Sequence, residues 1–324
     1  MPAATTITTR TSDYQPGLAW FATIGSVWVF VLVMLGAFTT SIGAGMIFED
    51  WPLSNGSLNP EGWLTDIMMF AEHSHRLSAG MMSIITIAIW LAVRRWEARA
   101  WVRKVALGAV VLVFAQALVG GLRVLLDPII LDFVSVGRLF AMLHAILAQV
   151  YICTLLAIAL GLSRMWIASQ SLGASMAVRR LGKWCCALLL LQLAIAAVMR
   201  HSYAGMAIPS FPLSSPEGDL LPPLWNFRVG IHFAHRVMAV VLTVALVRFA
   251  ISVWRDHEAH AGYKAAAAGV IVLLVGQIVL GASVIWMSRN PYVTTGHVLC
   301  GALLLALTFA MTMWANHTGE KTSA

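Results

Sequence analysis

Long apolar segments separated by short polar stretches make up most of the chain. A hydrocarbon layer of about 30 Å needs about 20 apolar residues for one helical crossing. The pattern predicts an all-α membrane protein with eight transmembrane helices. The first span is too long for the apolar core of a signal peptide, so we interpret it as a retained anchor. The predicted helices cover residues 18–40, 67–93, 104–126, 137–162, 181–200, 228–254, 264–287 and 294–316.

The composition agrees with this class, since 60% of the residues are hydrophobic and only 11% are charged. Soluble domains carry about 25% charged residues. A net charge of +7 raises the question of a nucleic-acid partner. The basic residues, however, cluster beside helix ends on one side, as the positive-inside rule requires. They therefore predict membrane topology, with cytoplasmic N- and C-termini, and no nucleic-acid partner.

The charged residues divide between the two sides of the predicted bilayer. Residues 1–17 do not resemble an Arg-rich transit peptide, which favours a bacterial inner membrane over a mitochondrion. The inner side is assigned Arg10, Arg94, Arg95, Arg99, Arg103, Lys104, Arg164, Arg179, Arg180, Lys183, Arg248, Arg255, Lys264 and Lys321, and the outer side Glu49, Asp50, Glu61, Asp66, Glu217 and Asp219.

The four cysteines fall inside predicted helices, where a structural disulfide is not expected. Their spacing does not fit a zinc site. We interpret them as small buried hydrophobic residues. They are Cys153, Cys185, Cys186 and Cys300.

The two halves of the chain resemble each other. Residues 41–54 read SIGAGMIFEDWPLS and residues 201–214 read HSYAGMAIPSFPLS, so Ala-Gly-Met and Pro-Leu-Ser recur at an offset of 160. His75-Arg76 recurs as His235-Arg236 at the same offset, and Gln116 and Gly120 recur as Gln277 and Gly281 at 161. His144 pairs with His297 at a shorter offset of 153. The repeats predict two fused, pseudo-symmetric four-helix bundles of the same orientation.

This duplication gives the expected domain organisation. Long outer loops at 41–66 and 201–227, rich in Gly, Pro and Ser, precede the second helix of each half. The predicted parts are a cytoplasmic tail at 1–17, an N-terminal half at 18–163, a cytoplasmic linker at 164–180, a C-terminal half at 181–316 and a cytoplasmic tail at 317–324.

Four histidines fall at one depth, toward the outer ends of their helices. His75 and His144 lie on the second and fourth helices, and His235 and His297 lie on the sixth and eighth. Two opposed imidazoles are the axial ligands of a six-coordinate haem iron. A single histidine in a membrane helix is more often a hydrogen-bonded packing residue, but four at matched depth favour haem ligation. Zinc or copper is less favoured, because each pair lacks a third ligand.

The segment Glu72-His73-Ser74-His75-Arg76 differs from its repeat at one ionisable position. Glu72 and His75 are three residues apart and share a helical face. The residue equivalent to Glu72 in the second half is His232. One pocket therefore has a carboxylate beside its ligand, which suggests a reacting site and a helper site. Alternatively, Glu72 pairs with Arg76 at (i, i+4) and neutralises two costly charges.

Two arginines follow the first ligand of each pair. A guanidinium is well shaped to bind a haem propionate. Arg76 and Arg236 are therefore possible propionate contacts, with snorkelling to the interface as the alternative.

Taken together, these residues resemble the haem A synthase family. The resemblance rests on Glu72-x-x-His75-Arg76, His144, His235-Arg236 and His297, and on the loop sequence Glu49-Asp50-Trp51-Pro52-Leu53-Ser54 with its preceding glycines. It extends from the first predicted helix to the last. Some members carry a cysteine pair in the first outer loop; residues 41–66 contain none, so a thiol relay there is excluded.

The resemblance implies an enzyme that oxidises the C8 methyl group of haem O to a formyl group, giving haem A for terminal oxidases. It implies a haem b cofactor between His235 and His297, and haem O between His75 and His144 with Glu72 near the reacting methyl. It also implies contact with haem O synthase and oxidase assembly factors, and exchange of electrons with a partner that the sequence does not identify.

The carboxylate of Glu72 has three possible roles in that reaction: it can orient water, accept a proton or stabilise positive charge at the carbon. Two other classes of protein share the histidine pattern, namely a bis-histidine dihaem electron carrier and a haem transporter. A carrier usually places its haems at two depths. A transporter gains nothing from a glutamate in only one half.

Overall fold

A computed structural model describes residues 10–131, 134–168, 174–257 and 259–317. Within these residues, eight helices are long and apolar enough to cross a membrane, which confirms the predicted class. They are α1 (Pro16–Ser41), α2 (Ile67–Trp96), α3 (Ala100–Leu125), α4 (Val136–Leu162), α6 (Met176–His201), α7 (Phe227–Arg255), α8 (Ala261–Trp286) and α9 (Pro291–Ala315).

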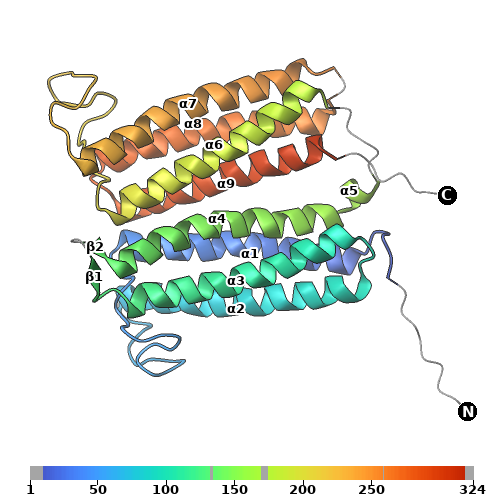
Figure 1. Cartoon of the computed structure of the whole chain (residues 1–324), viewed down its shortest axis with the longest axis horizontal. Helices are drawn as coiled ribbons and strands as arrows, with labels where there is room; N and C mark the ends of the chain where they lie inside the picture. Colours follow the sequence, from blue (N-terminus) through green and yellow to red (C-terminus); the bar gives the residue numbers. More distant parts are fainter. Residues whose placement is uncertain (1–9, 132–133, 169–173, 258, 318–324) are drawn as a thin grey trace, which may run out of the picture.

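The long helices form two groups that lie side by side, α1–α4 and α6–α9 (Figure 1). In the first group α1 packs on α2, α2 on α3, α3 on α4, and α4 on α1. The same ring of neighbours joins α6, α7, α8 and α9. This is the neighbour pattern that the predicted duplication requires. The groups meet through α1 and α4 of the first and α6 and α9 of the second.

Contacts between polar side chains and the backbone also join the groups. Arg200, near the end of α6, donates to the carbonyl of Ala37 and to the hydroxyl of Ser41 on α1, both at 2.8 Å. Thr295 of α9 donates to the same Ser41 hydroxyl at 3.4 Å. The two halves are therefore tied by hydrogen bonds near one end of the bundle as well as by apolar packing.

Both long loops, 42–66 and 202–226, lie at one end of the bundle, called the loop end from here on (Figure 1). The helices that follow these loops begin with polar caps: Asp66 accepts from two backbone N–H groups of α2, and Asn226 accepts from one of α7. Asn290 caps α9 at the same end. Such caps satisfy N–H groups that have no partner within the helix.

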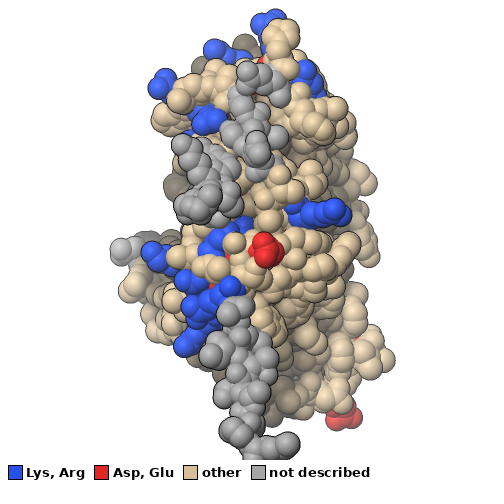
Figure 2. Space-filling view, turned by 90° about the vertical axis from the view of Figure 1, so that its right-hand side faces the viewer, with Lys and Arg blue, Asp and Glu red and all other residues tan. Residues whose placement is uncertain are grey.

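α1 begins and α9 ends at the opposite end, called the terminal end. Lys and Arg side chains gather there, and few acidic side chains are visible (Figure 2). Arg94 and Arg95 lie in the last turn of α2, and Arg255 ends α7. This is the asymmetry on which the predicted topology depends.

Several local features differ from the sequence prediction, and helix ends differ by up to five residues. A two-stranded hairpin, β1 (Ile130–Leu131) and β2 (Val134–Ser135), occupies the expected plain loop before α4. A short helix, α5 (Arg164–Ala168), follows α4, and α6 starts at Met176, inside the segment 164–180 expected to be linker. α2 continues to Trp96, three residues beyond the predicted end, because the helix extends through its basic last turn.

Parts of the predicted tails and linker, residues 1–9, 169–173 and 318–324 with Lys321, lie outside the described residues. All four cysteines are free thiols, Cys153 and Cys185 buried, and Cys186 and Cys300 partly buried. This agrees with a packing role.

Candidate functional site

The four predicted ligands lie near the loop end of the bundle. Each falls within about the first three turns of a helix that begins at that end: His75 on α2, His144 on α4, His235 on α7 and His297 on α9. All four imidazoles are partly buried. The structure therefore places them at one depth, as their positions in the sequence predict.

The second half brings its histidine pair together directly. The ring centroids of His235 and His297 are 6.4 Å apart, with an interplanar angle of 69°. A metal–imidazole bond is about 2 Å long, so two rings that bind one iron from opposite sides have centroids about 6 Å apart. The separation matches that of axial ligands on one iron.

Glutamine side chains from the neighbouring helices approach this pair. The Gln192 side-chain nitrogen lies 3.5 Å from Nε2 of His235 and donates to that residue's carbonyl at 3.0 Å. The Gln277 side-chain nitrogen lies 3.5 Å from Nε2 of His297. Each imidazole of the pair is therefore flanked by an amide that can orient it.

The first half places its pair against glycines. A Cβ atom at Gly36 of α1 would lie 2.7 Å from Cε1 of His75, and one at Gly120 of α3 would lie 3.2 Å from Cε1 of His144. Nδ1 of His144 lies 3.1 Å from the Gln116 carbonyl. In the second half Gly281 stands in the same way against His297. Because these glycines have no side chain, the imidazole rings have room beside the neighbouring helices.

The donor set fits a haem iron. Nδ1 atoms of His75, His235 and His297 are buried without a hydrogen-bond partner, so each ring has a nitrogen that protein groups leave unused. Among the described residues, no three His, Cys, Asp or Glu side chains converge as a tetrahedral metal site requires. Paired imidazoles without a third protein ligand are the set that haem uses.

Glu72 is buried, with 4% of its surface exposed, and its carboxylate is fully engaged. Oε2 accepts from the backbone N–H groups of Ile47 at 2.7 Å and Phe48 at 3.2 Å. Oε1 accepts from Arg76 at 2.6 Å. The predicted (i, i+4) pair is confirmed. The contact with the loop was not predicted.

Arg76 binds the first long loop as well as Glu72. Its guanidinium donates to the carbonyls of Phe48 at 3.0 Å and Asp50 at 2.7 Å, and also to that of Leu53. Both terminal nitrogens therefore bind protein oxygens, so the structure places this predicted propionate contact against the loop backbone.

The second half repeats these three bonds from an arginine to loop carbonyls, an arrangement called the loop clamp from here on. Arg236 donates to the carbonyls of Ile208 at 3.1 Å, Ser210 at 2.6 Å and Leu213 at 3.2 Å. Each acceptor lies 160 residues after its counterpart in the first loop. The recurring His-Arg and Pro-Leu-Ser motifs therefore encode one local structure, a guanidinium that holds the long loop on its helix.

In the second half, His232 is the counterpart of Glu72 and likewise contacts the long loop. Its Nδ1 accepts from the backbone N–H of Ile208 at 3.2 Å, and Ile208 is the counterpart of Phe48. The two residues share the task of holding the loop, but only Glu72 adds a negative charge. Sequence reasoning detected the difference in charge and missed the common contact.

Two further residues stabilise the first loop, and the sequence did not single them out for this. His73 is buried, with Nδ1 3.0 Å from the Ser54 hydroxyl and Nε2 3.1 Å from the Leu58 carbonyl. Asp50 accepts from the N–H groups of Asn55 and Gly56. Burial raises the pKa of Asp50, but these N–H groups and Arg76 outweigh it and hold that pKa below its usual value.

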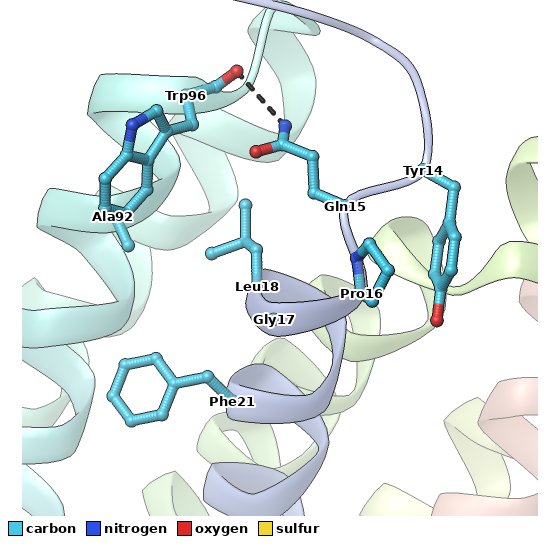
Figure 3. A pocket seen from close by; sticks show the side chains of 8 residues that line it. All are labelled: Tyr14, Gln15, Pro16, Gly17, Leu18, Phe21, Ala92 and Trp96. Carbon is cyan, nitrogen blue, oxygen red and sulfur yellow. Dashed lines mark hydrogen bonds between the residues drawn. The ribbon is translucent and has the colours of Figure 1, made fainter.

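A hollow between α1 and α2 lies at the terminal end, far from the histidines. It is lined by the side chains shown in Figure 3, and Gln15 there donates to the Trp96 carbonyl at 3.3 Å. Its position at the other end of the helices separates it from the histidine pairs.

The fold and the site define a class: a helical membrane protein with two pairs of histidines near one end of its helices. Residues 19–309 match the COX15-CtaA family, described as "Cytochrome oxidase assembly protein". The chain belongs to that family.

Several curated proteins named "Heme A synthase" are similar to the chain. The protein of Alkalihalophilus pseudofirmus is 26% identical, over 90% of this chain and 95% of its own length. That of Geobacillus kaustophilus is 28% identical, over 90% and 92%. That of Staphylococcus aureus strain RF122 is 26% identical, over 95% and 99%.

Proposed function

We propose that this chain is a haem A synthase, which oxidises the C8 methyl group of haem O to a formyl group. One observation carries the proposal: two histidine pairs lie at the same depth, and a carboxylate accompanies only one of them. Membership of the family and full-length similarity to proteins named "Heme A synthase" support it.

The two halves have different roles in this proposal. His235 and His297 hold a resident haem b, which when bound supplies one-electron redox chemistry. His75 and His144 would hold the iron of the substrate, haem O, with Glu72 near the reacting methyl group. A carboxylate that already accepts three hydrogen bonds is fixed in position, and Glu72 is such a group.

Glu72 is the only acidic residue of α2, the helix that carries His75. Held in place by Arg76, its carboxylate can stabilise positive charge or accept a proton near the reacting carbon. His232 cannot supply a negative charge at the equivalent place. The asymmetry supports assigning the reaction to the first half.

Haem extraction from cells tests this function. We expect a host that makes haem O but lacks its own synthase to accumulate haem A when it expresses this chain. Chromatography of the extracted haems measures the conversion. Unchanged haem O with a well-expressed protein would contradict the proposal. It would favour the alternatives, a dihaem electron carrier or a haem transporter.

The proposed setting is the bacterial inner membrane, with both termini cytoplasmic and the histidines toward the outer face. Haem O synthase and oxidase assembly factors are proposed neighbours, because they supply the substrate and receive the product. The gathering of basic side chains at the terminal end supports this orientation.

Reporter fusions test the orientation. We expect fusions within residues 94–104, 164–183 and 255–264 to report a cytoplasmic location, because these segments carry the basic clusters. Fusions in the loops at 42–66 and 202–226 serve as the outward-facing control. An outward reading at residue 175 would reverse the topology.

A further inference from the structure

The first pocket contains an arginine that the loop clamp does not use. Arg123 lies on α3, three residues after Gly120 and seven after Gln116. Residues at this spacing share a helical face. Gln116 and Gly120 both contact His144, so Arg123 lies on the same stripe, one turn nearer the loop end.

The guanidinium of Arg123 lies within electrostatic range of His75 and His144. Glu72, Asp127 and Tyr203 also lie within that range. Yet among the described residues it forms no ion pair within 4.0 Å and no hydrogen bond. The carboxylate of Asp127, four residues further on, accepts a hydrogen bond from the Ser135 hydroxyl at 2.6 Å.

The space that Arg123 occupies is specific to this half. A Cβ atom at Gly45, in the first copy of the Ala-Gly-Met motif, would collide with its guanidinium. The second copy has Gly205, where a Cβ atom would meet nothing within 4 Å. At the offset of 161 that relates the glycines of α3 and α8, the counterpart of Arg123 is Val284. The duplication therefore kept the glycine but has no cation at the position equivalent to Arg123.

A partly buried cation without a partner is costly in a membrane protein. A porphyrin held between His75 and His144 carries two propionates, and a guanidinium binds a carboxylate with two parallel hydrogen bonds. Arg76 has both terminal nitrogens on protein oxygens, which leaves Arg123 as the cation free to bind such a group.

We infer that Arg123 binds a propionate carboxylate of the porphyrin in the first half and thereby fixes which ring edge faces Glu72. This inference rests on the proposed function, because it requires a porphyrin between His75 and His144. In this role Arg123 is a binding and positioning residue, and the contact has no counterpart in the second half.

Titrating the full-length protein with two porphyrins tests the inference. The probes are haem b and its dimethyl ester, which lacks carboxylates, and absorbance in the Soret band measures binding. The signal that disappears in a His75→Ala/His144→Ala chain belongs to the first half. We expect Arg123→Gln to weaken the binding of haem b there about 10- to 100-fold. The ester should bind the variant and the unmodified chain within about twofold of each other.

A matched glycine pair adds a second measurement. Gly45→Ala should displace the guanidinium and weaken haem b binding in the same direction, whereas Gly205→Ala should leave it unchanged. Equal weakening of haem b and of its ester in Arg123→Gln would show that Arg123 only maintains the fold, and would overturn the inference. Full-strength binding of haem b in that variant would overturn it as well.

The outcomes separate this inference from the proposed function. If the unmodified chain shows no binding that depends on His75 and His144, the assignment of a porphyrin to the first half fails and the role of Arg123 fails with it. If that binding is present but does not depend on Arg123, only the role of Arg123 fails.

Discussion

Replacing His235 or His297 with alanine is expected to remove the low-spin, bis-histidine spectrum of the purified protein. Each change removes one proposed iron ligand from the second half, where the ring centroids lie 6.4 Å apart. A six-coordinate haem that loses one strong ligand becomes five-coordinate or is lost. The absorption and electron paramagnetic resonance spectra of the purified variants measure this directly.

Alanine substitutions of the two histidines in the first half should affect the low-spin spectrum and the yield of haem A differently. His75→Ala and His144→Ala are expected to leave most of the low-spin signal, because the resident haem is assigned to the other half, but to reduce haem A to below about 1% of normal. Identical spectral loss in all four variants would contradict the assignment of cofactor and substrate to separate halves. His257→Ala, an exposed change near the terminal end, controls for expression.

Glu72→Gln is expected to lower haem A formation about 100-fold or more, the range found for a lost acid–base group. The amide is nearly isosteric and its oxygen can still accept from the backbone N–H groups of Ile47 and Phe48. The fold and haem binding should therefore persist. Haem O, or a partly oxidised alcohol, should accumulate in extracts resolved by chromatography.

The second half supplies a matched control for this variant. His232→Gln changes the residue that accepts the equivalent backbone N–H, from Ile208, without removing a negative charge. If Glu72 serves only to hold the loop, Glu72→Gln and His232→Gln should lower stability and activity to similar extents. Arg76→Gln is not expected to restore the expression of Glu72→Gln in that case, because it removes the donor that holds the loop carbonyls. Near-normal haem A in a well-expressed Glu72→Gln protein would end the catalytic role proposed for this residue.

The sequence predicted the helices because each span must be apolar over most of its length, a requirement that a single sequence displays. It predicted their ends less well. Arg94 and Arg95 belong to α2 but lie beyond its apolar run, and the hairpin at 130–135 has no periodicity long enough to detect. The positions of the four histidines followed from helix direction alone.

The contacts of the long loops could not be predicted in the same way. Arg76 and Arg236 bind carbonyls, and a carbonyl is present at every residue, so no sequence motif marks the acceptors. The repeat at 160 was a usable signal that these residues share a local structure. Arg123 was missed because an arginine near a helix end is usual, and only the crowding at Gly45 distinguishes it.

The packing of the halves has a consequence for how the two pockets communicate. α4 and α9 contact each other, and each carries one of the proposed ligands, His144 and His297. A substitution that shifts α4 against α9 is therefore expected to change both proposed haem sites together.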